Sequence, residues 1–113
     1  MFYSLKKVKT IDVSNFKTDL CTDLSQMFQF CESLTYLDLK LFNTPDVKDM
    51  NSMFDGCSSL KRIDSLDKLS TEIVTDLSYM FRDCRSLESI SFGDKFTIKE
   101  VKNSAKCFRD VSY

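Results

Sequence analysis

Apolar residues return along the chain at an almost constant interval, and this interval predicts how the chain is organised. Phenylalanine recurs at steps of 26, 26, 27 and 27 residues, at Phe2, Phe28, Phe54, Phe81 and Phe108. Such a period is typical of repeat proteins, in which one unit cannot bury its apolar side chains alone and stacks on its neighbours. We therefore expect a single domain over residues 1–113, with repeat units at 1–26, 27–52, 53–79 and 80–106 and a partial unit at 107–113.

Three units begin with nearly the same five letters: MFQFC at Met27, MFDGC at Met53 and MFRDC at Met80. The methionine, phenylalanine and cysteine are fixed, whereas the two letters between Phe and Cys vary. Fixed apolar positions among variable neighbours indicate side chains that face a shared core. The predicted core positions are Phe2, Met27, Phe28, Cys31, Leu34, Leu37, Phe42, Met53, Phe54, Cys57, Leu60, Met80, Phe81, Cys84, Leu87 and Phe108.

The segment 44–57, TPDVKDMNSMFDGC, has the apolar spacing of one face of a helix. Val47, Met50 and Met53 follow one another at intervals of three residues. Thr44 precedes Pro45, which is the usual order of an N-cap residue and a first helical position. We therefore expect a short helix here and in the equivalent segment of each unit.

After the cysteine, the segment 33–40, SLTYLDLK, alternates apolar and polar residues. Leu37 and Leu39 alternate with Tyr36, Asp38 and Lys40, and a period of two predicts a strand with one buried face. Each unit is therefore expected to contain a strand, a loop and a helix. The predicted fold class is an α/β repeat, a right-handed solenoid of about four strand-loop-helix turns with one parallel sheet.

The segment MFQFCESLTYLDLKLFNTPDVKDM (27–50) carries the whole repeat pattern, with MFxxC followed by SLxxLDL. This pattern resembles the BspA-like leucine-rich-repeat family of bacterial surface proteins, and the resemblance covers essentially the whole chain. It implies a leucine-rich-repeat-like solenoid that works in adhesion or in recognition of other macromolecules, often in long arrays on the cell surface. The last unit departs from the pattern, because Cys107 stands at the Met position and Val111 at the Cys position.

The chain has 113 residues, of which 42% are hydrophobic and 29% charged, as is usual for a soluble domain. Its net charge of −1 creates no field that attracts nucleic acid, so no nucleic-acid partner is expected. No apolar run is long enough for membrane insertion, and the first residues, MFYSLKKVKTID, do not form a signal peptide. We expect a cell-surface or secreted location if the chain is part of a longer exported protein, and a cytoplasmic one if it is complete.

Catalytic chemistry finds little support in the sequence. The chain contains no histidine, which excludes Ser-His and Cys-His catalysis and His-ligated metals. Its two glycines, Gly56 and Gly93, cannot form a phosphate-binding loop. The five cysteines stand where core positions need apolar residues, so we interpret them as core residues rather than as disulfide or metal sites. We therefore expect neither an enzyme nor a bound cofactor.

One polar column stands out, because Asp12, Asp38 and Asp64 are predicted to project from adjacent parallel strands about 4.8 Å apart. Like charges at that distance need compensation. Two explanations remain open. The carboxylates bond to loop amides and to neighbouring cations such as Lys40 and Arg62, or they bind a divalent cation, which needs about six converging oxygens.

The predicted function is a protein-binding module that recognises its partner through the exposed strand face. The candidate contact residues on that face are Thr10, Asp12, Tyr36, Asp38, Lys40, Arg62 and Asp64. Tyr36 and Arg62 are the first choices, because tyrosine and arginine are enriched in interface hot spots. The alternative is a structural element, a spacer or a small subunit that associates through uncapped terminal turns, and such ends also predict a homodimer.

Overall fold

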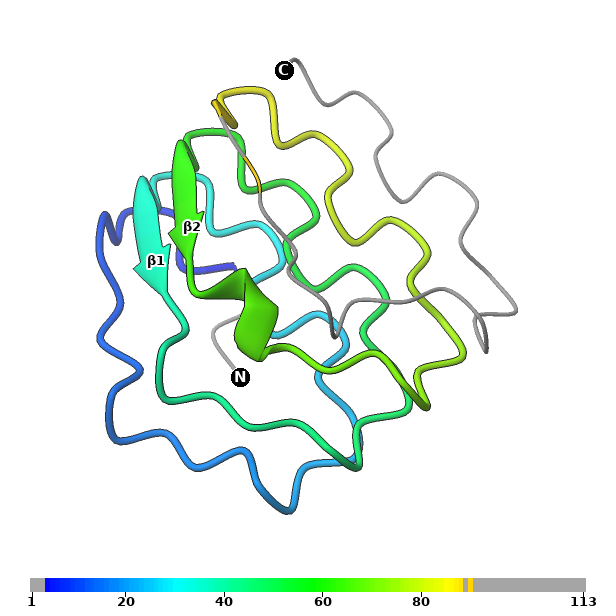
Figure 1. Cartoon of the computed structure of the whole chain (residues 1–113). Helices are drawn as coiled ribbons and strands as arrows, with labels where there is room; N and C mark the ends of the chain where they lie inside the picture. Colours follow the sequence, from blue (N-terminus) through cyan, green and yellow to red (C-terminus); the bar gives the residue numbers. More distant parts are fainter. Residues whose placement is uncertain (1–3, 89, 91–113) are drawn as a thin grey trace.

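The computed structural model describes residues 4–88 and 90 (Figure 1). The described elements are two parallel strands, β1 (Tyr36–Asp38) and β2 (Arg62–Asp64), and one 3-10 helix, η1 (Leu66–Lys68). The strands pair in register, with Leu37 opposite Ile63, and a bridge between Thr10 and Tyr36 brings the first unit alongside β1. Equivalent positions of successive units therefore lie next to one another on this side of the molecule.

The predicted fold class, an α/β repeat forming a right-handed solenoid of about four strand-loop-helix turns, is wrong. The described residues form no α-helix, and their sheet has two strands of three residues each, so the structure is a small globule built mainly from turns. No helix in this part of the chain is long and apolar enough to cross a membrane.

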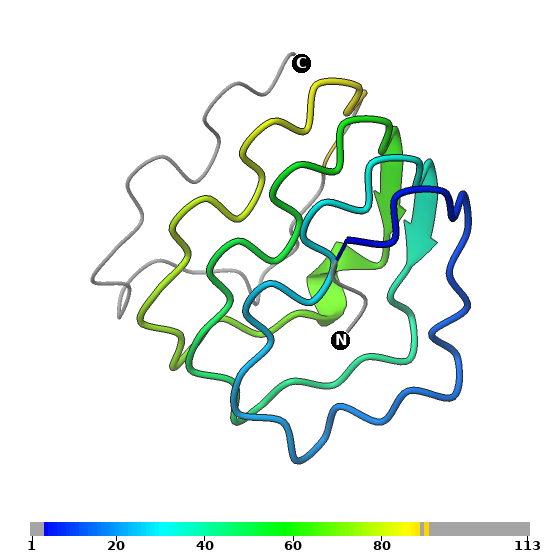
Figure 2. The same cartoon turned by 180° about the vertical axis from the view of Figure 1, so that it is seen from behind.

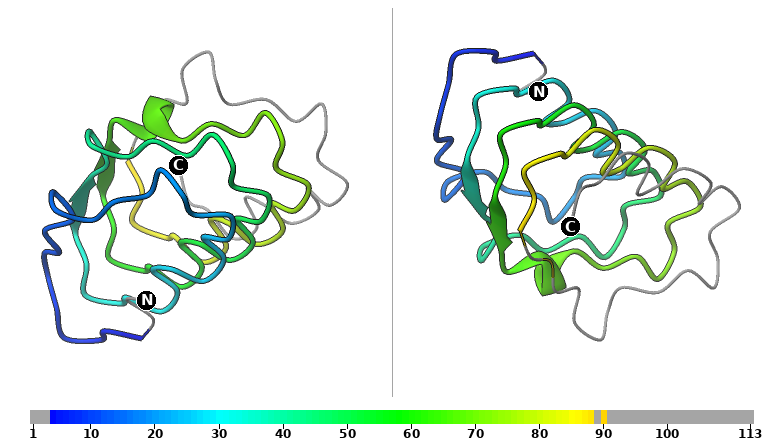
Figure 3. Two further views of the ribbon diagram at one scale, coloured as in Figure 1. Left: turned by 90° about the horizontal axis from the view of Figure 1, so that it is seen from below. Right: turned by 90° about the horizontal axis from the view of Figure 1, so that it is seen from above.

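The segments that we expected to be helical fold into three runs of tight turns, at 24–31, 50–57 and 77–84, which we call the turn ladder. Within a run, the amide of Met53 donates to the carbonyl of Met50 (3.3 Å), three residues back rather than the four of an α-helix. Between runs, the amide of Phe54 donates to the carbonyl of Met80 (2.9 Å). Figure 2 shows the three runs side by side, and Figure 3 shows them away from the strands.

Left-handed backbone conformations exclude a helix in each run. Six residues of the turn ladder have a positive φ between 56° and 76°, and they are Gln26, Phe30, Ser52, Gly56, Tyr79 and Asp83. Each is the third residue of a four-residue turn, the position that a type II turn places in the left-handed region. Such residues cannot continue a right-handed helix, so the amides turn to the neighbouring unit for their hydrogen bonds.

The predicted helix start at Thr44 is also wrong, because its hydroxyl bonds to another unit. Thr44 is 1% exposed, and its Oγ1 accepts a hydrogen bond from the amide of Ser70 (2.9 Å). Thr18 makes the equivalent bond with Asn43, 25 residues away, at 2.9 Å. These threonines therefore join successive units rather than cap helices.

The repeated apolar positions form one core. Their side chains are at most 3% exposed at Met27, Phe28, Cys31, Leu34, Leu37, Phe42, Met53, Phe54, Cys57, Leu60, Met80, Phe81, Cys84 and Leu87. The rings of Phe28, Phe54 and Phe81 stack at 5.5 and 5.4 Å. Phe2 and Phe108 lie outside the described residues, as do the last units from residue 91 onwards.

The change of the repeat from 26 to 27 residues coincides with η1. The sequence places an extra residue between Asp64 and Leu69, and η1 spans Leu66–Lys68. Leu66 turns inward at 1% exposure, and Leu69 follows at 0%. The short helix therefore accommodates the extra residue and returns the chain to the shared core.

Candidate functional site

The predicted contact residues lie on and beside the two strands, and we call them the strand face: Thr10, Asp12, Tyr36, Asp38, Lys40, Arg62 and Asp64. The register of the sheet places Tyr36 opposite Arg62 and Asp38 opposite Asp64. Thr10 forms its bridge with Tyr36. The strand positions between them, Leu37 and Ile63, are buried, so the polar side chains of the strands project away from the core.

Three side chains of the strand face form a connected cluster. The Tyr36 hydroxyl donates a hydrogen bond to Asp64 Oδ2 at 2.9 Å, and Arg62 Nε lies 3.2 Å from Asp64 Oδ1. The Arg62 guanidinium also lies over the Tyr36 ring, with Cζ 4.6 Å from the ring centroid. The hydrogen bond to the Asp64 carboxylate raises the pKa of Tyr36, because ionisation of the phenol would break it. The three contacts hold a tyrosine and an arginine in a defined arrangement at the surface.

An open pocket of about 360 Å³ lies beside this cluster, between the first and second units. Its lining residues are Thr10, Ile11, Asp12, Val13, Ser14, Tyr36, Leu37, Asp38, Lys40 and Leu41. It therefore contains five of the seven strand-face residues, whereas Arg62 and Asp64 stand outside it. Sequence reasoning missed the apolar contribution of Leu41, which is 55% exposed. No feature of the sequence signals this exposure, since Leu41 continues the alternation of Leu37 and Leu39 and would be expected to be buried.

The carboxylates of the strand face are compensated locally. Asp12 Oδ1 accepts a hydrogen bond from the amide of Ser14 (2.9 Å), and Asp38 Oδ1 accepts one from the amide of Lys40 (3.0 Å). The Ser14 hydroxyl and amide lower the pKa of Asp12, with a further contribution from the charge of Lys40. In residues 4–88 and 90, no three Asp, Glu, Cys or His side chains form a group that could hold a metal ion.

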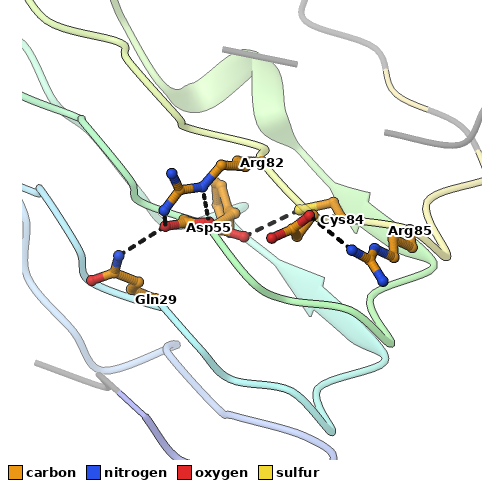
Figure 4. Close-up of polar contacts among 7 residues, drawn as sticks. Gln29, Asp55, Arg82, Cys84 and Arg85 are labelled. Atoms are coloured by element: carbon orange, nitrogen blue, oxygen red, sulfur yellow. Dashed lines mark hydrogen bonds and ion pairs between the residues drawn. The ribbon is translucent and has the colours of Figure 1, made fainter. Parts of the chain in front are cut away.

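A second polar feature lies inside the turn ladder, at the third letter of the repeated word. Asp55 is buried at 0% exposure and pairs with the Arg82 guanidinium through two contacts, Nε to Oδ1 at 3.0 Å and Nη2 to Oδ2 at 2.7 Å (Figure 4). Gln29 Nε2 donates to Asp55 Oδ2 at 2.9 Å. Three consecutive units thus place Gln, Asp and Arg in one hydrogen-bonded column.

The two letters that vary in MFQFC, MFDGC and MFRDC showed no constraint in the sequence pattern, but the structure gives both of them contacts between units. The third letters are the Gln29, Asp55 and Arg82 column. At the fourth letter, the Phe30 ring lies against the backbone of Gly56, which has φ +76°. The available signal was complementarity, because an acidic residue stands next to a basic one at equivalent positions of neighbouring units.

The described cysteines are thiols rather than disulfides: Cys21, Cys31, Cys57 and Cys84. Cys57 Sγ donates to the carbonyl of Phe28 at 3.1 Å, and burial raises the pKa of the Cys57 thiol well above its ordinary value. A raised pKa disfavours the thiolate, which is the form that attacks a substrate or binds a metal. Cys107 lies outside the described residues.

Comparison with known proteins places the chain in a family. Its whole length, residues 1–113, matches the family described as "Mycoplasma protein of unknown function, DUF285". Comparison with curated proteins and with solved structures found no match. The family is a repeat family of surface proteins. This agrees with the repeat pattern and with the resemblance to surface-protein repeats. The chain therefore belongs to the DUF285 family.

Proposed function

We propose that this protein is a non-enzymatic binding module that recognises a protein partner through the strand face. The observation that carries this proposal is the cluster of Tyr36, Arg62 and Asp64 next to an open pocket. Tyrosine and arginine are over-represented among the residues that dominate binding energy at protein interfaces. Contacts that order these side chains before binding reduce the entropy lost on association.

The pocket has the composition of a peptide-binding surface. Its lining combines apolar residues, among them Val13, Leu37 and Leu41, with polar ones such as Thr10 and Asp38. Interfaces usually combine apolar contact area with hydrogen-bonding groups. A side chain of the partner can therefore bury apolar surface in the pocket while its polar atoms bond to the polar lining residues.

The family membership also supports a proposal about the protein's subfamily and its location. We propose that the protein is a BspA-like member with leucine-rich-repeat character in its sequence, and that binding serves adhesion at the cell surface. Protease treatment of intact source cells, followed by an immunoblot, tests the location. Loss of the band is the expected result, and a band protected until the cells are lysed would contradict a surface location.

Selection of peptides from a random displayed library, using the whole chain as bait, tests the binding function without a known partner. We expect enriched peptides whose affinity falls by about tenfold in the Tyr36→Ala and Arg62→Ala variants, which corresponds to the loss of a moderate hot spot. Asp83→Asn is the matched control, because Asp83 lies in the turn ladder, away from the strand face, and forms an exposed ion pair with Arg85.

Two outcomes would reject the proposal. One is a library that yields no enriched peptide on the folded chain. The other is a set of peptides that bind the Tyr36→Ala, Arg62→Ala and Asp83→Asn variants with the same affinity as the unaltered protein. Circular dichroism of each variant separates loss of the contact from loss of the fold.

A second candidate function, assembly through the end of the molecule, is favoured by one observation. Leu5 and Val8 occupy columns whose later members, such as Cys31 and Leu34, are fully buried, yet each is 36% exposed. Covering them with another copy of the chain would remove apolar surface from water. We propose a homodimer through this end as the alternative to partner recognition.

Charge reversal separates the two candidates. The Asp38→Lys and Arg62→Glu variants change the strand face and leave Leu5 and Val8 untouched. A recognition module loses its selected peptides in these variants. An assembly element keeps a mass that rises with concentration in analytical ultracentrifugation, and a monomer mass at all concentrations would reject the dimer.

A further inference from the structure

We infer that the pocket between the first and second units binds an arginine or lysine side chain of the partner. This inference rests on the proposed function and names the chemistry that the strand face recognises. The pocket combines apolar residues, among them Ile11 and Leu41, with two carboxylates, Asp12 and Asp38, in a single open space of about 360 Å³. A long aliphatic side chain with a cationic end matches both parts.

The exposed apolar residues of the lining suit the aliphatic part of such a side chain. Leu41 is 55% exposed, and Ile11, which also lines the pocket, is half-buried. Arginine and lysine bury their methylene groups on apolar surface and keep the charged end in water. Contact with Leu41 would thus remove apolar surface of both partners from solvent.

The carboxylates suit the cationic end. Each uses Oδ1 for a backbone amide two residues on, Ser14 for Asp12 and Lys40 for Asp38. Within residues 4–88 and 90, Asp38 Oδ2 makes no further hydrogen bond or ion pair. A bond from a guanidinium or ammonium group to this oxygen would be charge-assisted and therefore stronger than a neutral one.

The charges around the pocket favour a cation over an anion. Arg62 is paired with Asp64 outside the pocket, so its charge is already compensated. Lys40 is the pocket's own cation and stands against two carboxylates, which leaves the lining with a net negative charge. Like charges would repel an acidic side chain from this position, whereas a basic one gains attraction.

The test uses NMR titration of the whole ¹⁵N-labelled chain with N-acetyl-arginine methylamide. The matched probe is N-acetyl-citrulline methylamide, which has the same length and a planar end group but carries no charge and has a carbonyl oxygen in place of one NH2 group. We expect the arginine compound to shift amides within 10–14 and 36–41 and to bind more tightly than the citrulline compound. Asp38→Asn should weaken arginine binding by about threefold, the usual size of an exposed ion pair.

Asparagine is the appropriate substitution because its own Oδ1 can accept the same backbone bond, so only the charge is removed. The control is Asp23→Asn, since Asp23 Oδ1 accepts the amide of Ser25 (2.8 Å) in the same local geometry but lies outside the pocket. It should leave arginine binding unchanged. Equal binding of the citrulline compound, shifts confined to other residues, or an Asp38→Asn variant that binds as well as the unaltered protein would overturn the inference.

Library selection distinguishes failure of this inference from failure of the proposed function. Peptides that depend on Tyr36 and Arg62 but carry no arginine or lysine would reject the cation site and leave the binding function intact. Peptides enriched in arginine or lysine that lose affinity in Asp38→Asn, but not in Asp23→Asn, are the expected result. Peptides that bind regardless of the strand face would reject the binding function itself.

Discussion

Single side chains connect neighbouring units at the two variable letters of the repeated word. Asp55 receives bonds from the unit before it through Gln29 and from the unit after it through Arg82. A fully buried carboxylate is costly unless it is paired and hydrogen-bonded, and here both oxygens have partners. This column therefore specifies which units can lie next to one another.

Asp55→Asn tests the column. The substitution keeps the size of the side chain and removes the charge that faces Arg82, which is itself 30% exposed. We expect the free energy of unfolding to fall by about 2 kcal/mol. This is less than the loss of about 3–5 kcal/mol for a fully buried pair, because Arg82 is partly exposed. Asp83→Asn, which alters an exposed pair, should cost less than about 1 kcal/mol. Urea denaturation measures both, and equal small losses would contradict the role assigned to Asp55.

Gly56→Ala tests the contact at the fourth letter. A Cβ at Gly56 would lie 2.5 Å from Cδ1 of the Phe30 ring, and the backbone there has φ +76°. We expect a loss of about 1–3 kcal/mol in the free energy of unfolding, from left-handed strain together with the steric conflict. The loss should be smaller when the substitution is made in a Phe30→Ala background. The same loss in both backgrounds would mean that the ring is not involved.

The bond between Tyr36 and Asp64 predicts a pH dependence at the strand face. Because the folded-state pKa of Tyr36 is raised above its ordinary value of 10.0, the bond stabilises the fold below that pH. The contribution is lost as the pH rises through the folded-state pKa. Asp64→Asn should lower the pKa of Tyr36 towards its ordinary value, as measured by NMR titration of labelled tyrosines. An unchanged pKa would show that the carboxylate does not hold the phenol.

At the scale of elements, the turn ladder explains which sequence predictions succeed. Spacings of three residues place Val47, Met50 and Met53 on one side of a helix, and they place the same residues inward in a run of turns. All three are fully buried, so the pattern identifies the core but not the backbone that presents it. The sequence does not predict the backbone angle φ at these turns, because Ser52 and Tyr79 are not residue types that usually adopt a left-handed conformation.

The strand face could be predicted more fully than the turn ladder, because its side-chain directions follow from the alternation of residues along the strand. Alternation at Leu37 and Leu39 fixes the direction of Tyr36 and Asp38, whether the strand is long or only three residues. The pocket could not be predicted, because it depends on how closely the first unit approaches β1. The strand register equals the repeat interval of 26 residues and could be predicted, whereas the contacts of Asp64 with Tyr36 and Arg62 depend on side-chain conformations that the sequence pattern does not give.

Gln26→Gly distinguishes the turn ladder from a helix by the sign of its effect. Gln26 is exposed and has φ 59°, so glycine removes left-handed strain at this position. We expect the free energy of unfolding to stay the same or to rise by up to about 1 kcal/mol, whereas glycine within a helix costs about 1 kcal/mol. Ser25→Gly is the control, since Ser25 has no positive φ and should lose stability. A loss at Gln26 as large as at Ser25 would contradict the turn ladder.

At the scale of the whole molecule, the interactions that hold the fold together connect residues about 25 to 30 positions apart in the sequence. The backbone bonds that join one run of the turn ladder to the next, the bonds of Thr18 and Thr44, and the Asp55 column all run between neighbouring units. Because each unit depends on the next, the core, the turn ladder and the strands support one another. The strand face is the part of this assembly whose ordered side chains project away from the core.

Amide hydrogen exchange of the whole chain, with and without a library-selected peptide, tests recognition through the strand face most directly. We predict slower exchange at the amides of Tyr36–Asp38, Arg62–Asp64 and residues 10–14, with little change in the turn ladder. Protection confined to residues 4–9, around Leu5 and Val8, would instead identify the end of the molecule as the binding surface. That result, or no protection at any strand-face amide, would contradict the account.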